Sequence, residues 1–251
     1  MNLIYDINPV TRIIALALYT TPLLISVDIV SALVSLISTL FFAPLLGVKW
    51  PLLFRRGAPI LIAAPISGLS MALYGRPEGK EYFSFLFAHV TDNSLALAAA
   101  IMVRVLAIGL PVIILLADID PTELGDGLAQ KLKLPSRFVI GAVAGARLVS
   151  LFRRDWDFLT RARRARGLAD DGLIRSTMTM TFSLLVLALR RGAKLATAME
   201  ARGFGRDQPR TWARESVWGI KDILVLIVCI TCSTVALIVA LKTGYLRVLG
   251  A

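Results

Sequence analysis

Long apolar blocks alternate with charged segments along this chain. Five apolar blocks approach the roughly 17–25 residues that a helix needs to cross the hydrocarbon of a bilayer. They are residues 10–27, 29–48, 58–74, 95–117 and 220–241. Only Asp28 separates the first two, so these are expected to form a hairpin with a tight turn. The pattern predicts an all-α polytopic membrane protein with about five transmembrane helices.

A different pattern follows the fourth block. Asp120, Pro121 and Glu123 have the spacing of a capped helix start, and a short helix is expected from there to about residue 133. From Ser136, apolar residues recur at spacings of four and three, and arginines occupy another face. The apolar stripe consists of Phe138, Ala142, Gly145, Val149, Phe152, Trp156 and Leu159. This periodicity predicts an amphipathic helix over 136–166, about 45 Å long.

Two long helices are expected to end in the same tripeptide. Ala165-Arg166-Gly167 closes the first, and Ala201-Arg202-Gly203 lies 36 positions later. Glycine can adopt the left-handed conformation that ends a helix. An arginine at a helix C-terminus gains about 0.3–1 kcal/mol from the dipole, but the dipole does not require Ala before it or Gly after it. A repeated docking knob, with a planar arginine fork for an acidic partner, accounts for all three residues. Two equal knobs indicate a partner made of two similar subunits.

The second of these helices carries a series of small residues that would allow close packing against another helix. They are Gly192, Ala193, Ala196, Ala198 and Ala201. Its earlier part, residues 176–189, is apolar but has only 14 residues between flanking arginines, which is short for a membrane span. We expect a buried cytoplasmic helix there, which could instead dip into the membrane interface or be covered by another membrane subunit.

Charge placement predicts the orientation. Of the 251 residues, 57% are hydrophobic and 18% are charged, which excludes a disordered or disulfide-stapled chain. The net charge is +11, and residues 118–216 hold 18 basic and 11 acidic residues, or +7. The loop expected between the second and third blocks holds Lys49, Arg55 and Arg56 and no acidic residue, whereas residues 75–93 hold more acidic than basic residues. By the positive-inside rule, the amino terminus and the basic region are cytoplasmic and the carboxyl terminus is external. No removable signal peptide is expected at the start.

The sequence offers no candidate set for catalysis. No stretch matches the phosphate-binding pattern Gly-x4-Gly-Lys-Ser/Thr, so ATP must be handled elsewhere. The single histidine, His89, falls in the predicted external loop. Cys229 and Cys232 are interpreted as small residues of a membrane helix. Arg104, inside the fourth span, is expected to have a structural role. Neither a cofactor nor a metal is expected on this chain, and it is not expected to be an enzyme.

Four segments together resemble the transmembrane T component of energy-coupling factor transporters, a class of ABC importers. Asn8-Pro9-Val-Thr-Arg12 resembles the family's amino-terminal Asp-Pro-x-x-Lys, with two replacements, and Arg104 resembles an arginine of a middle span. Leu134-Pro135-Ser-Arg137 and the run to Gly167 are similar to the first coupling segment. Residues 190–203 match the second closely, and the similarity extends over nearly the whole chain.

The resemblance implies a division of labour among subunits. Residues 1–117 would be a four-helix membrane part, 118–215 the cytoplasmic coupling region, and 216–251 the last span with an external tail. The coupling region would dock two cytoplasmic ABC ATPase subunits and support one small membrane S component, which binds a vitamin or trace nutrient. The docking residues would be Ala165, Arg166, Gly167, Ala201, Arg202 and Gly203. The supporting residues on the coupling helices would be Phe138, Phe152, Trp156, Gly192, Ala196 and Glu200. The complex would lie in a bacterial or archaeal cell membrane.

Three other interpretations remain. A self-sufficient channel or secondary carrier would usually have paired polar residues or repeats in the membrane, of which the sequence offers only Arg104. A membrane-anchored module could bind nucleic acid or anionic lipid through its basic region, although no nucleic-acid partner is expected. In a third, the second coupling helix crosses the membrane and places Arg202 outside.

Overall fold

The chain divides into two compact units. The computed structural model describes residues 6–26, 28–75, 80–85, 88–116, 118–168, 172–206 and 211–244. The first unit, called the membrane unit below, spans residues 1–119 and 217–251. The second, called the extension, spans residues 120–216.

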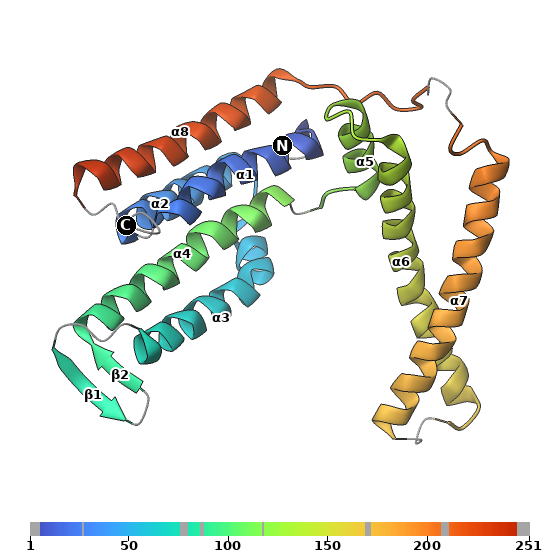
Figure 1. Ribbon diagram of the computed structural model, residues 1–251, viewed down its shortest axis with the longest axis horizontal. Coiled ribbons are helices and arrows are strands. Elements are labelled where there is room, and N and C mark those ends of the chain that lie inside the picture. Colours follow the sequence, from blue (N-terminus) through green and yellow to red (C-terminus); the bar gives the residue numbers. More distant parts are fainter. Residues whose placement is uncertain are drawn as a thin grey trace. The chain divides into compact units, whose positions relative to one another are not determined.

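Each unit is built from helices (Figure 1). The membrane unit contains α1 (Pro9–Ile25), α2 (Ile29–Leu45), α3 (Trp50–Tyr74), β1 (Glu81–Phe85), β2 (Ala88–Thr91), α4 (Asp92–Leu116) and α8 (Ile220–Lys242). The extension contains α5 (Pro121–Gln130), α6 (Ser136–Ala165) and α7 (Leu173–Ala201). The predicted class, an all-α polytopic membrane protein, is therefore confirmed.

A short β-hairpin joins α3 to α4, where a loop was predicted. Strands β1 and β2 pair in antiparallel orientation, with Ser84 opposite His89. His89 thus lies in a strand and not in a loop. Tyr, Phe, Val and Thr are enriched in strands, and this segment contains all four. Its brevity left no periodic signal in the sequence.

Among the described residues, helix lengths distinguish three candidate membrane spans from two shorter apolar helices. Helices α3, α4 and α8, of 25, 25 and 23 residues, are long and apolar enough to cross a membrane. Helices α1 and α2 have 17 residues each, about 25 Å, which is the short limit for a crossing. Helix α3 begins at Trp50, so Arg55 and Arg56, expected in a loop, lie within its early turns. Pro51 suits a helix start because its fixed φ is already helical.

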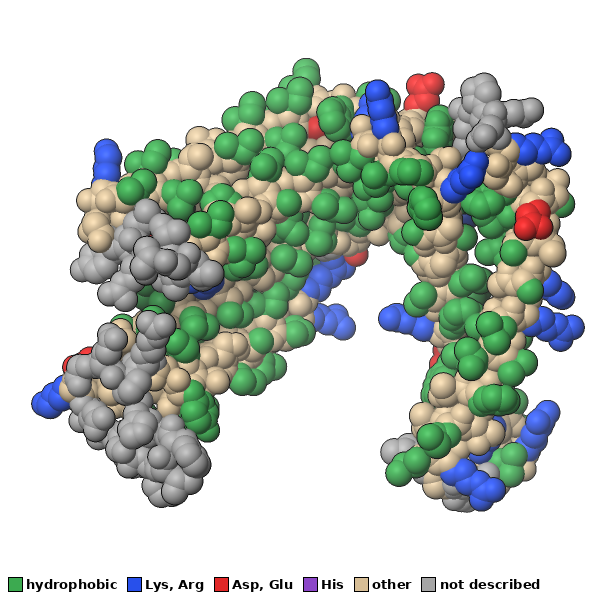
Figure 2. All heavy atoms as spheres, in the orientation of Figure 1, with side chains coloured by type: hydrophobic (Ala, Val, Ile, Leu, Met, Phe, Trp, Pro, Cys, Tyr) green, Lys and Arg blue, Asp and Glu red, His purple; other side chains and the backbone are tan. Residues whose placement is uncertain are grey.

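The membrane unit packs small residues inside and turns large apolar ones outward. Nine alanines of its helices are buried: Ala15, Ala32, Ala43, Ala64, Ala98, Ala100, Ala107, Ala236 and Ala240. Ile37, Phe41 and Leu69 are exposed, and Figure 2 shows hydrophobic side chains spread over the visible face of this unit. A Cβ added to Gly109 of α4 would lie 2.7 Å from Ile60 of α3, so these two helices approach closely. This arrangement is typical of helices that pack in lipid.

The Asn-Pro motif at the start of α1 is bonded to the start of α8. The Asn8 side chain accepts a hydrogen bond from the backbone N–H of Val10 at 3.0 Å and so caps α1. The backbone N–H of Asn8 donates to the Asp222 carboxylate at 2.8 Å, and that of Gly219 donates to the other carboxylate oxygen at 2.7 Å. Asp222 is buried. One carboxylate therefore holds the starts of α1 and α8 together.

Arg104 binds the turn between α1 and α2. Its guanidinium donates to the backbone carbonyl of Ser26 and, at 3.3 Å, to that of Asp28. Asp28 is buried and caps α2 by accepting from the backbone N–H of Ser31 at 2.6 Å. The arginine therefore satisfies carbonyls at a helix end, which is the structural role that was predicted for it.

Removing this contact is expected to destabilise the membrane unit. In Arg104→Leu the Ser26 and Asp28 carbonyls lose a charged donor, at a cost of about 1–3 kcal/mol for each buried group left unsatisfied. Thermal unfolding of the purified chain in nanodiscs should show a lower transition temperature, and Arg104→Lys, which keeps the charge, should recover part of it. An unchanged transition temperature in Arg104→Leu would mean that the contact does not contribute to stability.

Candidate functional site

The extension is organised on α5, where the incoming and outgoing segments meet. The Asp120 carboxylate accepts from the backbone N–H of Thr122 at 2.9 Å, which caps α5 and lowers the pKa of Asp120. Glu123, expected to complete a capping box, lies 3.8 Å from the guanidinium of Arg214. The Gln130 side chain donates to the Arg214 carbonyl at 2.7 Å and accepts from the backbone N–H of Ser216 at 2.8 Å. Side chains of α5 thus hold the segment that leaves the extension.

Helix α6 leaves this base as the long amphipathic helix that the sequence predicted. It packs on α5 through Val139 and Val143. A Cβ added to Gly125 of α5 would lie 2.3 Å from Val143, so the absence of a side chain there permits the contact. Its 30 residues extend about 45 Å. Arg147, on another face, donates to the Thr122 hydroxyl at 2.9 Å.

The α6 C-terminus has the closure that its tripeptide predicted. Gly167 adopts a left-handed conformation, with φ of +71°. Its N–H donates to the Arg164 carbonyl at 3.1 Å, and that of Leu168 donates to the Arg163 carbonyl at 3.1 Å. These two bonds define a Schellman motif with Arg166 at the C-cap. The Arg166 side chain is exposed beyond the last turn.

Helix α7 ends in the same way. Gly203 has φ of +81°, its N–H donates to the Glu200 carbonyl at 2.9 Å, and the N–H of Phe204 donates to the Met199 carbonyl at 2.9 Å. Arg202 occupies the C-cap and is exposed. The two Ala-Arg-Gly sequences are therefore structurally equivalent, and each glycine is needed for its φ. The closure accounts for the glycine but leaves the arginine free to serve a partner.

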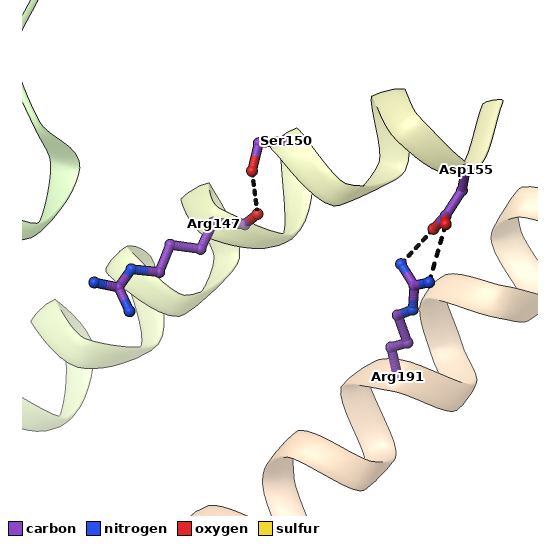
Figure 3. A network of polar contacts seen from close by, with 4 residues as sticks. All are labelled: Arg147, Ser150, Asp155 and Arg191. Atoms are coloured by element: carbon purple, nitrogen blue, oxygen red, sulfur yellow. Dashed lines mark hydrogen bonds and ion pairs between the residues drawn. The ribbon is translucent and has the colours of Figure 1, made fainter. Parts of the chain in front are cut away.

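An ion pair joins α6 to α7 (Figure 3). Both carboxylate oxygens of Asp155 accept from the guanidinium of Arg191, one of them at 2.9 Å. Asp155 is only 8% exposed. The basic segment around Asp155 and Asp157 predicts surface ion pairs for these carboxylates. Asp155 does form an ion pair, but its side chain is buried and not at the surface. Asp155 lies among Phe152, Trp156 and Leu159 on the apolar face, and a carboxylate there requires a partner.

The other predicted supporting residues lie on α6 and α7 with different surroundings. Phe152 and Trp156 are half-buried, whereas Phe138 is 78% exposed. Ala196 and Glu200 are exposed. A Cβ added to Gly192 would meet open space, so this glycine makes no close helix contact with the described residues of the extension, contrary to the expectation from its size. The small residues of α7 leave a face that the described residues of the extension do not cover.

The first half of α7 is exposed and not buried, which corrects the prediction for residues 176–189. Large apolar side chains follow one face at spacings of four and three, and all are exposed: Ile174, Met178, Phe182, Leu185 and Leu189. We call this set the α7 row. Met180, off this row, is buried. The periodicity correctly indicated an apolar face, but no part of the extension that the structure describes covers it.

A polar cleft lies beside Arg202. It has a volume of about 510 Å³ and is lined by residues from the start of α6 and from the segment after α7, including Arg137, Arg202, Phe204 and Arg206. Three guanidinium groups on its wall favour an anionic occupant such as a carboxylate. Sequence reasoning missed Arg137 and Arg206 as neighbours of Arg202, since they come together only when the helices fold back.

The fold and this site define a class: a polytopic helical membrane protein with an extension whose two long helices end in matched arginines. The chain belongs to the CbiQ family, described as cobalt transport protein, which matches residues 2–212. It is similar to the energy-coupling factor transporter transmembrane protein EcfT of Streptococcus equi, with 25% identity over 91% of this chain and 89% of the relative. The EcfT of Bacillus subtilis is also 25% identical, over 90% and 89%. That of Lactococcus lactis is 29% identical over 64% and 65%.

Proposed function

We propose that this chain is the transmembrane T component of an energy-coupling factor importer. The observation that carries this proposal is the family match over residues 2–212, together with EcfT relatives that align over about nine tenths of the chain. Its role is to couple ATP-driven movement to the uptake of a vitamin or trace nutrient.

In this proposal the two arginine ends dock two cytoplasmic ABC ATPase subunits. Arg166 and Arg202 are exposed at equivalent C-caps, and a guanidinium fork binds a carboxylate with two hydrogen bonds. Ala165 and Ala201 keep the flank thin, and Gly167 and Gly203 turn the chain away. The cleft beside Arg202 offers room for an acidic side chain. ATP binding and hydrolysis belong to the partner subunits, since the sequence has no phosphate-binding loop.

The uncovered apolar faces of the extension fit the second partner, one small membrane S component that binds the nutrient. The α7 row is a line of large exposed apolar side chains on one helix face, and Phe138 on α6 is a further exposed apolar side chain. Exposed apolar patches mark interaction sites. Choice of the nutrient lies with the S component. A self-sufficient channel or carrier is not favoured, because Arg104, the ionisable residue that could have lined a path, is bound to turn carbonyls.

The proposed location is a bacterial or archaeal cell membrane, with the amino terminus and the extension in the cytoplasm and the carboxyl terminus outside. The net charge of +7 over residues 118–216 supports this orientation. Arg55 and Arg56 also support it, because α3 begins nearby and α4 ends at Leu116, before Asp118, which pairs with Arg56 at 2.8 Å. The start of α3 and the end of α4 therefore lie on the same side, where Arg55 and Arg56 are found.

One labelling experiment tests both docking and orientation. Cys229 and Cys232 are replaced by alanine, and Ala201→Cys places a single thiol beside Arg202. A membrane-impermeant maleimide should label it in inverted vesicles and not in intact cells, and two co-purifying ATPase subunits should protect it. Labelling from the outside would refute the orientation. Labelling from the inside without co-purifying ATPases, or without protection by them, would refute docking.

A further inference from the structure

Helices α6 and α7 contain a repeat longer than the Ala-Arg-Gly ends. When residues 151–167 are set against 187–203, with an offset of 36, seven of the 17 positions are identical. The pairs are Leu151/Leu187, Arg154/Arg190, Leu159/Leu195, Ala162/Ala198, Ala165/Ala201, Arg166/Arg202 and Gly167/Gly203. Two helices with equivalent sequences and identical Schellman closures are related as two copies of one element.

Asp155 and Arg191 occupy equivalent positions of this repeat, since 191 minus 155 is also 36. In a pair of equivalent helices, side chains at equivalent positions meet each other only where a two-fold axis passes between them. The ion pair between Asp155 and Arg191 therefore marks a local pseudo-two-fold axis at the crossing of α6 and α7. At this position the two copies carry opposite charges, so the symmetry produces an attraction and not a repulsion.

The same geometry places the two docking arginines at equal distances from the axis. Arg166 follows Asp155 by 11 residues, and Arg202 follows Arg191 by 11 residues. Eleven residues of α-helix extend about 16 Å and complete three turns plus about 20°, so each arginine starts from nearly the same helix face as its member of the ion pair. The crossing is thus the centre of two arms of equal length.

Packing at the crossing is too sparse to fix the angle between the arms alone. A Cβ on Gly192, next to Arg191, would meet open space, and Ala193 and Ala196 on the same helix are exposed. The paired charges are shielded, with the Asp155 side chain 10% exposed and that of Arg191 35% exposed. Partly buried ion pairs of this kind contribute little net stability, but their two-point geometry restricts orientation.

We propose that Asp155 and Arg191 are positioning residues: as a pivot on the pseudo-two-fold axis, their ion pair sets the separation of Arg166 and Arg202. The proposal rests on the proposed function for its consequence, because the separation must match two sockets on the ATPase pair. Loss of the pivot leaves both arginines in place but no longer held at one spacing. ATP hydrolysis then continues while less of it drives transport.

The first test measures the spacing in the chain alone, so it does not depend on docking. Spin labels are attached at Ala162→Cys and Ala198→Cys, exposed and equivalent positions one turn before the ends, in a background with Cys229 and Cys232 replaced by alanine. Double electron–electron resonance in nanodiscs should give one narrow distance distribution. Asp155→Arg should shift and broaden it, Asp155→Asn should broaden it less, and the exchange Asp155→Arg with Arg191→Asp should restore it. Asp157→Arg, the same change at an exposed neighbour, is the control.

The second test measures coupling in the assembled importer. Asp155→Arg should lower the nutrient transported per ATP hydrolysed, with both ATPases still co-purifying, and the charge exchange should recover it. An unchanged distance distribution in Asp155→Arg, or an exchange that fails to restore it, would overturn the pivot. If the distances respond as expected but no ATPase binds the unmodified chain, the pivot holds and the proposed function is wrong.

Discussion

Arg166→Glu combined with Arg202→Glu is expected to abolish ATP-driven uptake and the recovery of ATPase subunits with the chain. Each substitution replaces a guanidinium by a carboxylate at an exposed C-cap. The acidic docking site proposed on each ATPase would then repel the new carboxylate. Loss of one hydrogen-bonded charge pair at an interface costs about 2–5 kcal/mol. The lower value already weakens binding about 30-fold, and the double variant loses two such pairs. Pull-down of the chain and uptake into proteoliposomes measure the two outcomes.

The structure provides a matched control for this double variant. Arg153 on α6 and Arg190 on α7 are also exposed arginines, and Arg153→Glu with Arg190→Glu makes the same change in net charge about three helical turns before each end. This control should retain ATPases and most of the uptake. Since the glycines are unchanged, both Schellman closures should persist in the test variant, and circular dichroism should be unaltered. Full ATP-driven uptake in the Arg166 and Arg202 variant would remove the basis for the docking assignment.

Phe182→Glu is expected to release the S component while both ATPases stay bound. Phe182 lies at the middle of the α7 row and is 68% exposed, so the isolated chain loses almost nothing when it changes. In the complex, burial of a phenylalanine side chain is worth about 1.5–3 kcal/mol, and a buried unpaired carboxylate adds a further cost. Binding of the S component should therefore weaken by more than about tenfold.

Ser183→Glu is the control for the α7 row. Ser183 is the next residue of the same helix, exposed and on a different face, and its hydroxyl donates to the Thr179 carbonyl at 2.9 Å. The same charge introduced there should leave the S component bound. Equal loss in both variants would indicate a general effect of acidity on α7, and retention of the S component by Phe182→Glu would exclude the row as its docking surface.

Local rules predicted much of the extension. Helical spacing gave α6, and the Ala-Arg-Gly tripeptides gave its end and that of α7, because glycine closure depends on a few neighbouring residues. The starting motif of α5 was likewise local. Asp120 caps that helix as its position suggested, although Glu123 turned to Arg214, about 90 residues away in the sequence.

Properties that depend on distant partners could not be predicted in the same way. The face of α7 with Phe182 was identified as apolar and therefore expected to be buried, but periodicity does not say which molecule covers a face. Arg55 and Arg56 were assigned to a loop because charges end an apolar block, whereas α3 continues through them in helical form. The Asp155–Arg191 pair forms only because α6 and α7 cross. The hydropathy pattern does not show where two helices cross.

The side chain of Gln130 ties the end of the extension to α5, the helix at which the extension begins. Residues 120 and 216 bound an inserted stretch, and Gln130 and Glu123 hold its outgoing peptide against the same short helix at which it begins. The extension is thus an insertion whose first and last residues lie beside the same helix, and its two connections are fixed by a few neighbouring side chains. Substitutions within residues 131–213 can therefore alter the extension without changing the side chains that fix its two connections.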